Sequence, residues 1–129
     1  MALRYLQHLC AWPVICRNQW MTPGELVAMQ ERALRRLVAH AYARVPHYRR
    51  LFDSEGLHPG SIVTLDDLRK VPVLTKEMVR AGYPGDILVS GLDRSECSPR
   101  MTSGSSGNKL EVMLDHRVAA LYRLMQLRQ

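Results

Sequence analysis

The sequence contains few aromatic residues, few cysteines and no long hydrophobic run. Aromatic residues make up 6% of the 129-residue chain, and Phe52 is the single phenylalanine. We therefore expect a core built mainly of Leu, Val, Met and Ala. No apolar stretch approaches the ~20 residues that cross a bilayer, so the sequence predicts no membrane span. Its 47% hydrophobic and 23% charged content is typical of one folded domain rather than of a disordered chain.

Cysteine and histidine are too sparse and too scattered to predict a metal site. The three cysteines, Cys10, Cys16 and Cys97, include no Cys-x-x-Cys pair. An odd number of unpaired cysteines favours a reducing, cytoplasmic setting. The histidines are His8, His40, His47, His58 and His116.

Positive charge is in excess but is not concentrated. The chain has 18 basic and 12 acidic residues, a net charge of +6. The tightest groups are Arg35–Arg36 and Arg49–Arg50, both in predicted helices, where a solvated face is the usual explanation. We therefore predict no nucleic-acid partner. A general attraction for anionic substrates stays open.

Residues 1–21 are predicted to form an N-terminal extension. The stretch "LRYLQHLCAWPVIC" loosely resembles a signal peptide, but Gln7 and His8 interrupt it and Pro13 breaks it. No small-residue cleavage site follows. We expect a helix or loop packed on the domain surface.

Residues 22–82 are predicted to be a helical part. Thr22 is a good N-cap, and Pro23 suits the first helical position. An apolar stripe at helical spacing follows, and Pro46 disfavours helical geometry at the residue before it, which ends the helix. The stripe predicts a common buried face for Val27, Gln30, Leu34, Leu37, Val38, Ala41 and Val45.

Shorter helices follow within this part. One is predicted over residues 47–55, with Gly56 suited to a left-handed stop. Thr64 and Asp67 resemble a capping box, and Thr75 can cap a further short helix.

Residues 86–129 are predicted to form a strand–loop–strand–helix pattern. "DILVS" and "CSPRMTS" are short and extended, and "LEVML" alternates Leu110, Val112 and Leu114 against Glu111 and Met113. The last of these segments leads into a helix capped by Asp115. The whole chain is therefore expected to have a mixed α/β fold.

The stretch "TSGSSGNK" combines glycine freedom with hydroxyl donors. Glycines let successive backbone N–H groups converge on one anion, and Ser and Thr add donors without bulk. A Walker A motif is excluded, because Asn108 follows Gly107 and Leu110 replaces the required hydroxyl residue. Phosphate binding and a structural turn both stay open on composition alone.

The same stretch resembles the phosphate-binding loop of the adenylate-forming enzymes, the superfamily of acyl- and aryl-coenzyme A synthetases. The upstream segment from Leu37 to Arg80 resembles the phenylacetate–coenzyme A ligase group, including CapK-like proteins. "Ala-Tyr-x-x-Val-Pro-x-Tyr-Arg", "Leu-x-Asp-Leu-x-x-x-Pro" and "Thr-Lys-Glu" match in order. Together the two regions cover most of the chain from about Trp20 onward.

The resemblance implies a site and its ligands. It implies that the ATP phosphates, with Mg, are held by Thr102, Ser103, Gly104, Ser105, Ser106 and Gly107. The superfamily pattern continues with any residue, Pro and Lys, whereas this chain has Asn108, Lys109 and Leu110. Phosphate contact and a solvent-facing position both stay open for Lys109.

The chemistry implied by the resemblance is acid–thiol ligation. A carboxylic acid attacks the α-phosphorus of Mg-ATP, which gives an acyl-adenylate and pyrophosphate, and coenzyme A then displaces AMP. Family members are much longer, and the adenine, ribose and acid pockets and the catalytic lysine have no candidates here. We therefore expect an incomplete N-terminal domain, a fragment that is inactive alone.

Two other classes stay open. One is a non-catalytic helical module that binds a partner. The other is a small stand-alone phosphate- or nucleotide-binding protein.

Overall fold

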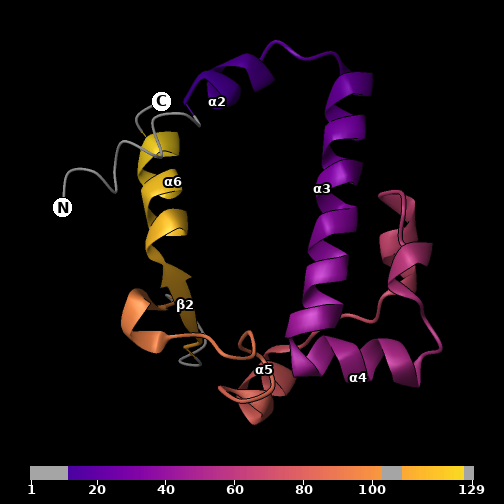
Figure 1. Ribbon diagram of the computed structural model, residues 1–129, viewed down its shortest axis with the longest axis vertical. Helices are drawn as coiled ribbons and strands as arrows, with labels where there is room; N and C mark the ends of the chain where they lie inside the picture. The colour runs from indigo at the N-terminus through magenta and orange to yellow at the C-terminus, as the bar shows by residue number, and fades with distance from the viewer. Residues whose placement is uncertain (1–11, 103–108, 127–129) are drawn as a thin grey trace. The chain divides into compact units, whose positions relative to one another are not determined.

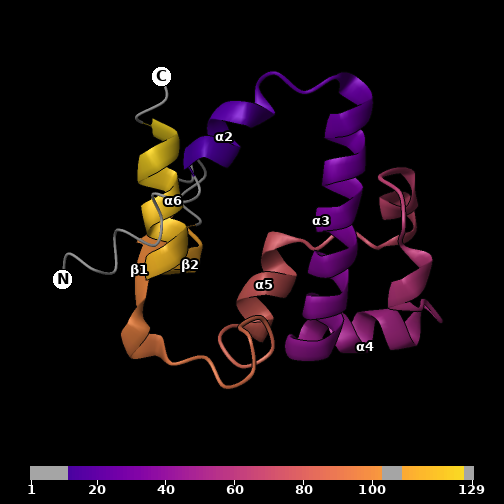
Figure 2. The ribbon, with the colours of Figure 1, turned by 45° about the horizontal axis from the view of Figure 1, so that its top comes forward.

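The computed structural model describes residues 12–102 and 109–126. It combines helices (Figure 1) with a two-stranded antiparallel sheet, both strands of which are labelled in Figure 2, and this confirms the predicted mixed α/β class. The chain forms two compact units. One consists of residues 23–92, and the other consists of residues 1–22 together with 93–129.

Two consecutive helices, visible in Figures 1 and 2, frame the 23–92 unit. Helix α3 spans Pro23–Arg44 and α4 spans Pro46–Ser54. Val45 separates them in an extended conformation (φ −111°, ψ 112°), because a proline disfavours helical geometry at the residue before it. Gly56 follows α4 with φ +62°, the left-handed conformation predicted for it.

The core of this unit lies between α3, α4 and the segment after α4. Leu34 and Val38 of α3 pack with Phe52 of α4 and with Ile62, and the last two are only 2% and 0% exposed. The half-buried residues around this cluster are Tyr42, Tyr48, Leu57 and Val71. Leu and Val make up most of the buried residues of this unit, as expected, and three of its few aromatic residues lie in or against the core.

The predicted stripe on α3 is only partly buried. Leu34, Val38 and Val45 are buried, but Leu37 is 64% exposed and Val27 is 43% exposed. Adjacent helical residues are rotated by ~100° from each other. The side of α3 that carries Leu34 and Val38 is covered by Phe52 and Ile62, and Leu37 lies beyond the edge of that contact.

Short helical segments complete the 23–92 unit. Two 3₁₀ turns span Pro59–Ser61 and Asp66–Lys70, and α5 spans Lys76–Gly82. The Oγ1 atom of Thr75 accepts a hydrogen bond from the Met78 amide at 3.2 Å, which confirms its predicted cap.

The predicted pairing of Thr64 and Asp67 is also present. The Asp67 carboxylate accepts hydrogen bonds from the Thr64 amide at 2.8 Å and the Thr64 hydroxyl at 2.9 Å. The same carboxylate oxygen accepts from the Val63 amide at 3.0 Å. Lys70 donates to the other carboxylate oxygen at 2.6 Å.

Residues 86–90 were predicted to be extended, and this prediction is wrong. They form turns that pack back on the end of α5. The Asp86 amide donates to the Gly82 carbonyl at 2.8 Å. A Cβ at Gly82 would lie 3.2 Å from side-chain atoms of Asp86 and Ile87, so a larger residue there would have to push these side chains aside. A local hydrogen-bonded turn replaces the strand because no described strand lies alongside to pair with it.

The second unit contains the sheet. Strands β1 (Cys97–Met101) and β2 (Glu111–Asp115) pair antiparallel, from Cys97 opposite Asp115 to Met101 opposite Glu111. Helix α2 spans Trp12–Asn18, and α6 spans His116–Gln126 directly after β2 (Figure 2).

Asp115 caps α6 as predicted, because its Oδ1 atom accepts a hydrogen bond from the Val118 amide at 2.7 Å. The predicted alternation of β2 is not followed. Val112 is 44% exposed, whereas Met113 and Leu114 are both half-buried.

Candidate functional site

The end of α3 is fully hydrogen-bonded, although a helix leaves its last four carbonyls without partners inside the helix. The Ala41 carbonyl accepts from the Val45 amide at 2.9 Å. The carbonyls of Tyr42 and Ala43 accept from Nε and Nη2 of Arg49 at 3.4 and 3.1 Å. The Arg44 carbonyl accepts from the Ser90 amide at 2.8 Å. A side chain of α4 and the backbone of a distant turn therefore cap α3.

Hydrogen bonds and one ion pair connect the turn segment 86–90 to α3 and α4. The His47 amide donates to the Asp86 carbonyl at 2.9 Å, which satisfies one free donor at the start of α4. The Asp86 carboxylate pairs with Arg50 at 2.7 Å. At its other end, the Ser90 carbonyl accepts from Nη2 of Arg44 at 3.2 Å. The segment thus spans the junction between α3 and α4.

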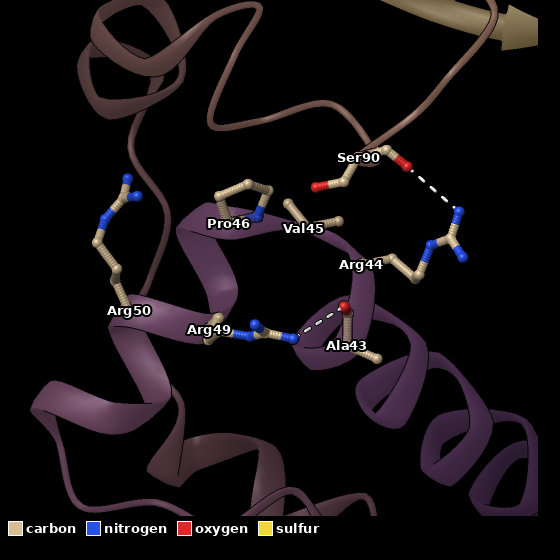
Figure 3. A pocket seen from close by; sticks show the side chains of 7 residues that line it. All are labelled: Ala43, Arg44, Val45, Pro46, Arg49, Arg50 and Ser90. Atoms are coloured by element: carbon tan, nitrogen blue, oxygen red, sulfur yellow. Dashed lines mark hydrogen bonds between the residues drawn. The ribbon is translucent and has the colours of Figure 1, made fainter.

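A cavity of about 180 Å³ lies at this junction. We call it the arginine pocket. Its lining residues are Ala43, Arg44, Val45, Pro46, Arg49, Arg50 and Ser90. Figure 3 shows the side chain of Arg49 directed toward Ala43 and that of Arg44 directed toward Ser90, while Arg50 extends away from the other two. Three arginines thus line the pocket together with the buried Val45.

Aromatic and acidic groups border Arg49. Its guanidinium carbon lies 5.8 Å from the centre of the Tyr42 ring, a cation–π distance. The Tyr42 hydroxyl donates to Asp53 at 2.9 Å. This hydrogen bond, together with the charge of Asp53, raises the pKa of Tyr42 above its ordinary value. Tyr42 therefore stays a neutral donor at physiological pH.

The glycine–hydroxyl stretch lies in the other unit, between β1 and β2. Its base is closed by two hydrogen bonds between Thr102 and Leu110. The Thr102 amide donates to the Leu110 carbonyl at 2.9 Å, and the Leu110 amide donates to the Thr102 hydroxyl at 3.0 Å. The two antiparallel strands are therefore joined by hydrogen bonds up to Thr102 and Leu110.

Of the six predicted phosphate-binding residues, the structure describes only Thr102. Ser103, Gly104, Ser105, Ser106 and Gly107 lie outside the described residues. The Thr102 hydroxyl is solvent-exposed and accepts the Leu110 amide, so its own proton can still be donated to a ligand. Lys109, beside this base, is exposed.

Other kinds of site find little support in the described part of the chain. Within residues 12–102 and 109–126, no group of three or more His, Cys, Asp or Glu side chains is placed to hold a metal ion. Cys16 and Cys97 are free thiols. None of the helices described is long and apolar enough to cross a membrane.

The arginine pocket was missed in the sequence. A solvated helix face is the expectation for Arg49 and Arg50, and nothing local connects them to Ser90, some 40 residues later. The usable signal was the order of residues around Pro46, since a basic residue three positions after a helix-breaking proline can reach back to the carbonyls of the preceding helix.

Comparison with known proteins supports one of the resemblances noted in the sequence. The chain is 48% identical over 62 residues to the phenylacetate–coenzyme A ligase of Escherichia coli (strain K12). It is 47% identical over 60 residues to the phenylacetate–coenzyme A ligases of Aromatoleum evansii and of Thermus thermophilus. These matches confirm the similarity to phenylacetate–coenzyme A ligases, whereas the likeness to CapK-like proteins stays a prediction.

The matched part is about half of this chain but only 14% of the length of each of these three relatives. No family model matches the chain.

Proposed function

We propose that this chain supplies the ATP-phosphate loop of an AMP-forming ligase that joins a carboxylic acid to coenzyme A. The similarity to phenylacetate–coenzyme A ligases carries the proposal. The hairpin that Thr102 and Leu110 close around the glycine–hydroxyl stretch supports it, because such a connection can present backbone amides to one oxyanion. An aryl-substituted acid, as in phenylacetate, is the proposed substrate class.

The loop acts on the phosphates of Mg-ATP. As the acid attacks the α-phosphorus, negative charge moves onto the departing pyrophosphate. Donors fixed in advance around that group stabilise the charge without reorganising during the reaction. Thr102 offers its hydroxyl proton at the base of the loop, held there by the bond from the Leu110 amide.

This segment alone is proposed to bind ATP weakly and not to catalyse ligation. A neutral hydrogen bond contributes about 0.5–1.5 kcal/mol net, and a charge-assisted one up to ~3 kcal/mol. A few such bonds are largely offset by the freedom lost on association, which costs at least about 4 kcal/mol. Contacts to the adenine, the ribose and the acid must come from other parts of a ligase.

Residue-resolved NMR on the isotope-labelled 129-residue chain tests the proposal. Pyrophosphate and Mg-ATP should produce saturable shifts at the amides of Thr102 and Leu110, while adenosine should not. Gly104→Val should abolish these shifts, because a branched side chain restricts the backbone and crowds the phosphate. Lys109→Ala is the matched control at the edge of the loop and should have a smaller effect.

Two results would contradict the proposal. One is an absence of saturable shifts at the hairpin with every phosphate compound. The other is acid-dependent pyrophosphate exchange well above background with this chain alone, because that would make it a complete ligase.

A further inference from the structure

We propose that the arginine pocket at the α3–α4 junction is a second anion site, which binds the phosphate group of a small ligand. It is formed wholly by residues of the 23–92 unit and does not depend on the hairpin loop or on the proposed ligase function.

The charge of the pocket is the first reason. Three of its seven lining residues are arginines, and none is acidic. Arg50 pairs with Asp86 at 2.7 Å, just outside the lining. Among the described residues, Arg44 and Arg49 have no carboxylate within ion-pair distance. Arg44 and Arg49 thus line the pocket without a carboxylate partner in the described part of the chain, and both are exposed to solvent.

Preorganisation is the second reason. Arg44 is held by the Ser90 carbonyl, and Arg49 is held by the carbonyls of Tyr42 and Ala43. These acceptors carry only partial negative charge, so they fix the guanidinium groups while offsetting their charge only in part. Each guanidinium has five N–H donors, and these bonds use at most two of them. An incoming anion thus meets donors whose side-chain entropy is already partly lost.

Size and ligand chemistry give the third reason. A cavity of about 180 Å³ is smaller than the roughly 300–1,000 Å³ pockets that enclose drug-sized ligands. It suits a single anionic group rather than a whole nucleotide. Two separate guanidinium groups favour a phosphate, whose several oxygens can accept from both, over a singly charged carboxylate.

The test is an NMR titration of the labelled 129-residue chain at constant ionic strength. The probes are inorganic phosphate, AMP and acetate. Phosphate and AMP should give saturable shifts at the amides of Arg44 and Ser90 and at the Arg49 side-chain Nε–H, while acetate should not. A tighter AMP complex would identify a nucleotide as the source of the phosphate group, and equal affinities would identify the phosphate group alone.

Two variants distinguish a specific phosphate site from a general effect of positive charge. Arg44→Gln should weaken phosphate binding by at least about tenfold, the loss expected for a charge-assisted hydrogen bond. Arg36→Gln, which removes the same charge from an exposed position of the same helix, should change affinity by less than about twofold. Circular dichroism of both variants checks that α3 remains folded.

A third variant is expected to bind phosphate more tightly, and such an increase cannot result from loss of the folded structure. Asp86→Asn keeps the backbone carbonyl that caps α4 but releases Arg50 from its carboxylate. Because the change removes a negative charge beside the pocket, phosphate binding should tighten severalfold. The proposal is overturned if acetate matches phosphate, if Arg36→Gln and Arg44→Gln lose affinity equally, or if Asp86→Asn leaves phosphate affinity unchanged.

Discussion

Arg44 and Ser90 bind each other in both directions. The Ser90 amide donates to the Arg44 carbonyl at 2.8 Å, and Nη2 of Arg44 donates to the Ser90 carbonyl at 3.2 Å. The pair links the last residue of α3 to a turn 46 residues later in the chain. It therefore fixes both the end of the helix and one wall of the arginine pocket.

Removing the Ser90 amide should destabilise this unit. Ser90→Pro leaves the Arg44 carbonyl without its donor, and we expect a loss of about 1–3 kcal/mol in the free energy of unfolding. Urea denaturation followed by circular dichroism measures it. Ser90→Ala retains both backbone groups and should stay within about 0.5 kcal/mol of the parent chain. Equal losses in the two variants would mean that the Ser90 hydroxyl, not its backbone, matters.

Substitutions in the buried core and on the exposed side of α3 should have very different effects on stability. Phe52 is 2% exposed in the core, so Phe52→Ala should cost about 3–5 kcal/mol or prevent folding. Leu37 is 64% exposed, so Leu37→Asp should change stability by no more than about 0.5 kcal/mol. Thermal melts compare the variants. A large loss from Leu37→Asp would show that this face is covered in solution.

The Asp67 carboxylate should make the stability of the 23–92 unit fall at acid pH. Lys70 and the amides of Thr64 and Val63 hold the pKa of its carboxyl far below the ordinary value. Because the folded-state pKa is the lower one, the stabilisation is complete above the unfolded pKa of about 4 and is lost as the pH falls below it. Melting temperatures measured from pH 7 downward should fall less steeply in Asp67→Asn.

Asp66 provides the control for this experiment. It lies one residue away, and its contact with Arg69 is a long 3.6 Å between exposed side chains. Asp66→Asn should therefore keep the acid sensitivity of the parent chain. The same pH dependence in Asp67→Asn and in the parent would rule out the Asp67 carboxylate as its source.

The hydroxyl of Tyr42 should titrate at a higher pH than that of a free tyrosine. The hydroxyl is held as a donor by Asp53, which raises its pKa. Since the folded-state pKa is the higher one, this stabilisation is present below the unfolded value of about 10 and is lost as the pH rises through the folded value. NMR or ultraviolet titration of Asp53→Asn should return Tyr42 toward the ordinary value. A Tyr42 titration unchanged by Asp53→Asn would assign the shift to another cause.

Local signals predicted the boundaries of several elements. Pro23 and Pro46 stand at the first positions of α3 and α4, Thr75 and Asp115 cap α5 and α6, and Gly56 takes positive φ. Each of these effects acts within about four residues, because it depends on one side chain or one backbone angle. Such features are fully specified by the neighbouring sequence.

The buried faces and the arginine pocket were decided by tertiary structure. The periodicity of α3 placed Leu37 beside Leu34 and Val38, but the position of Phe52 and Ile62 determined which side was covered. Residues 86–90 carried an extended pattern, yet they turned back on α5.

The contact of Ser90 with Arg44 joins segments 46 residues apart, and no local sequence pattern predicts it. The sequence determined where the helices begin and end and which stretch resembles a phosphate loop. Which side chains meet depends on how distant segments fold back, and that is a property of the whole packed unit rather than of any local stretch.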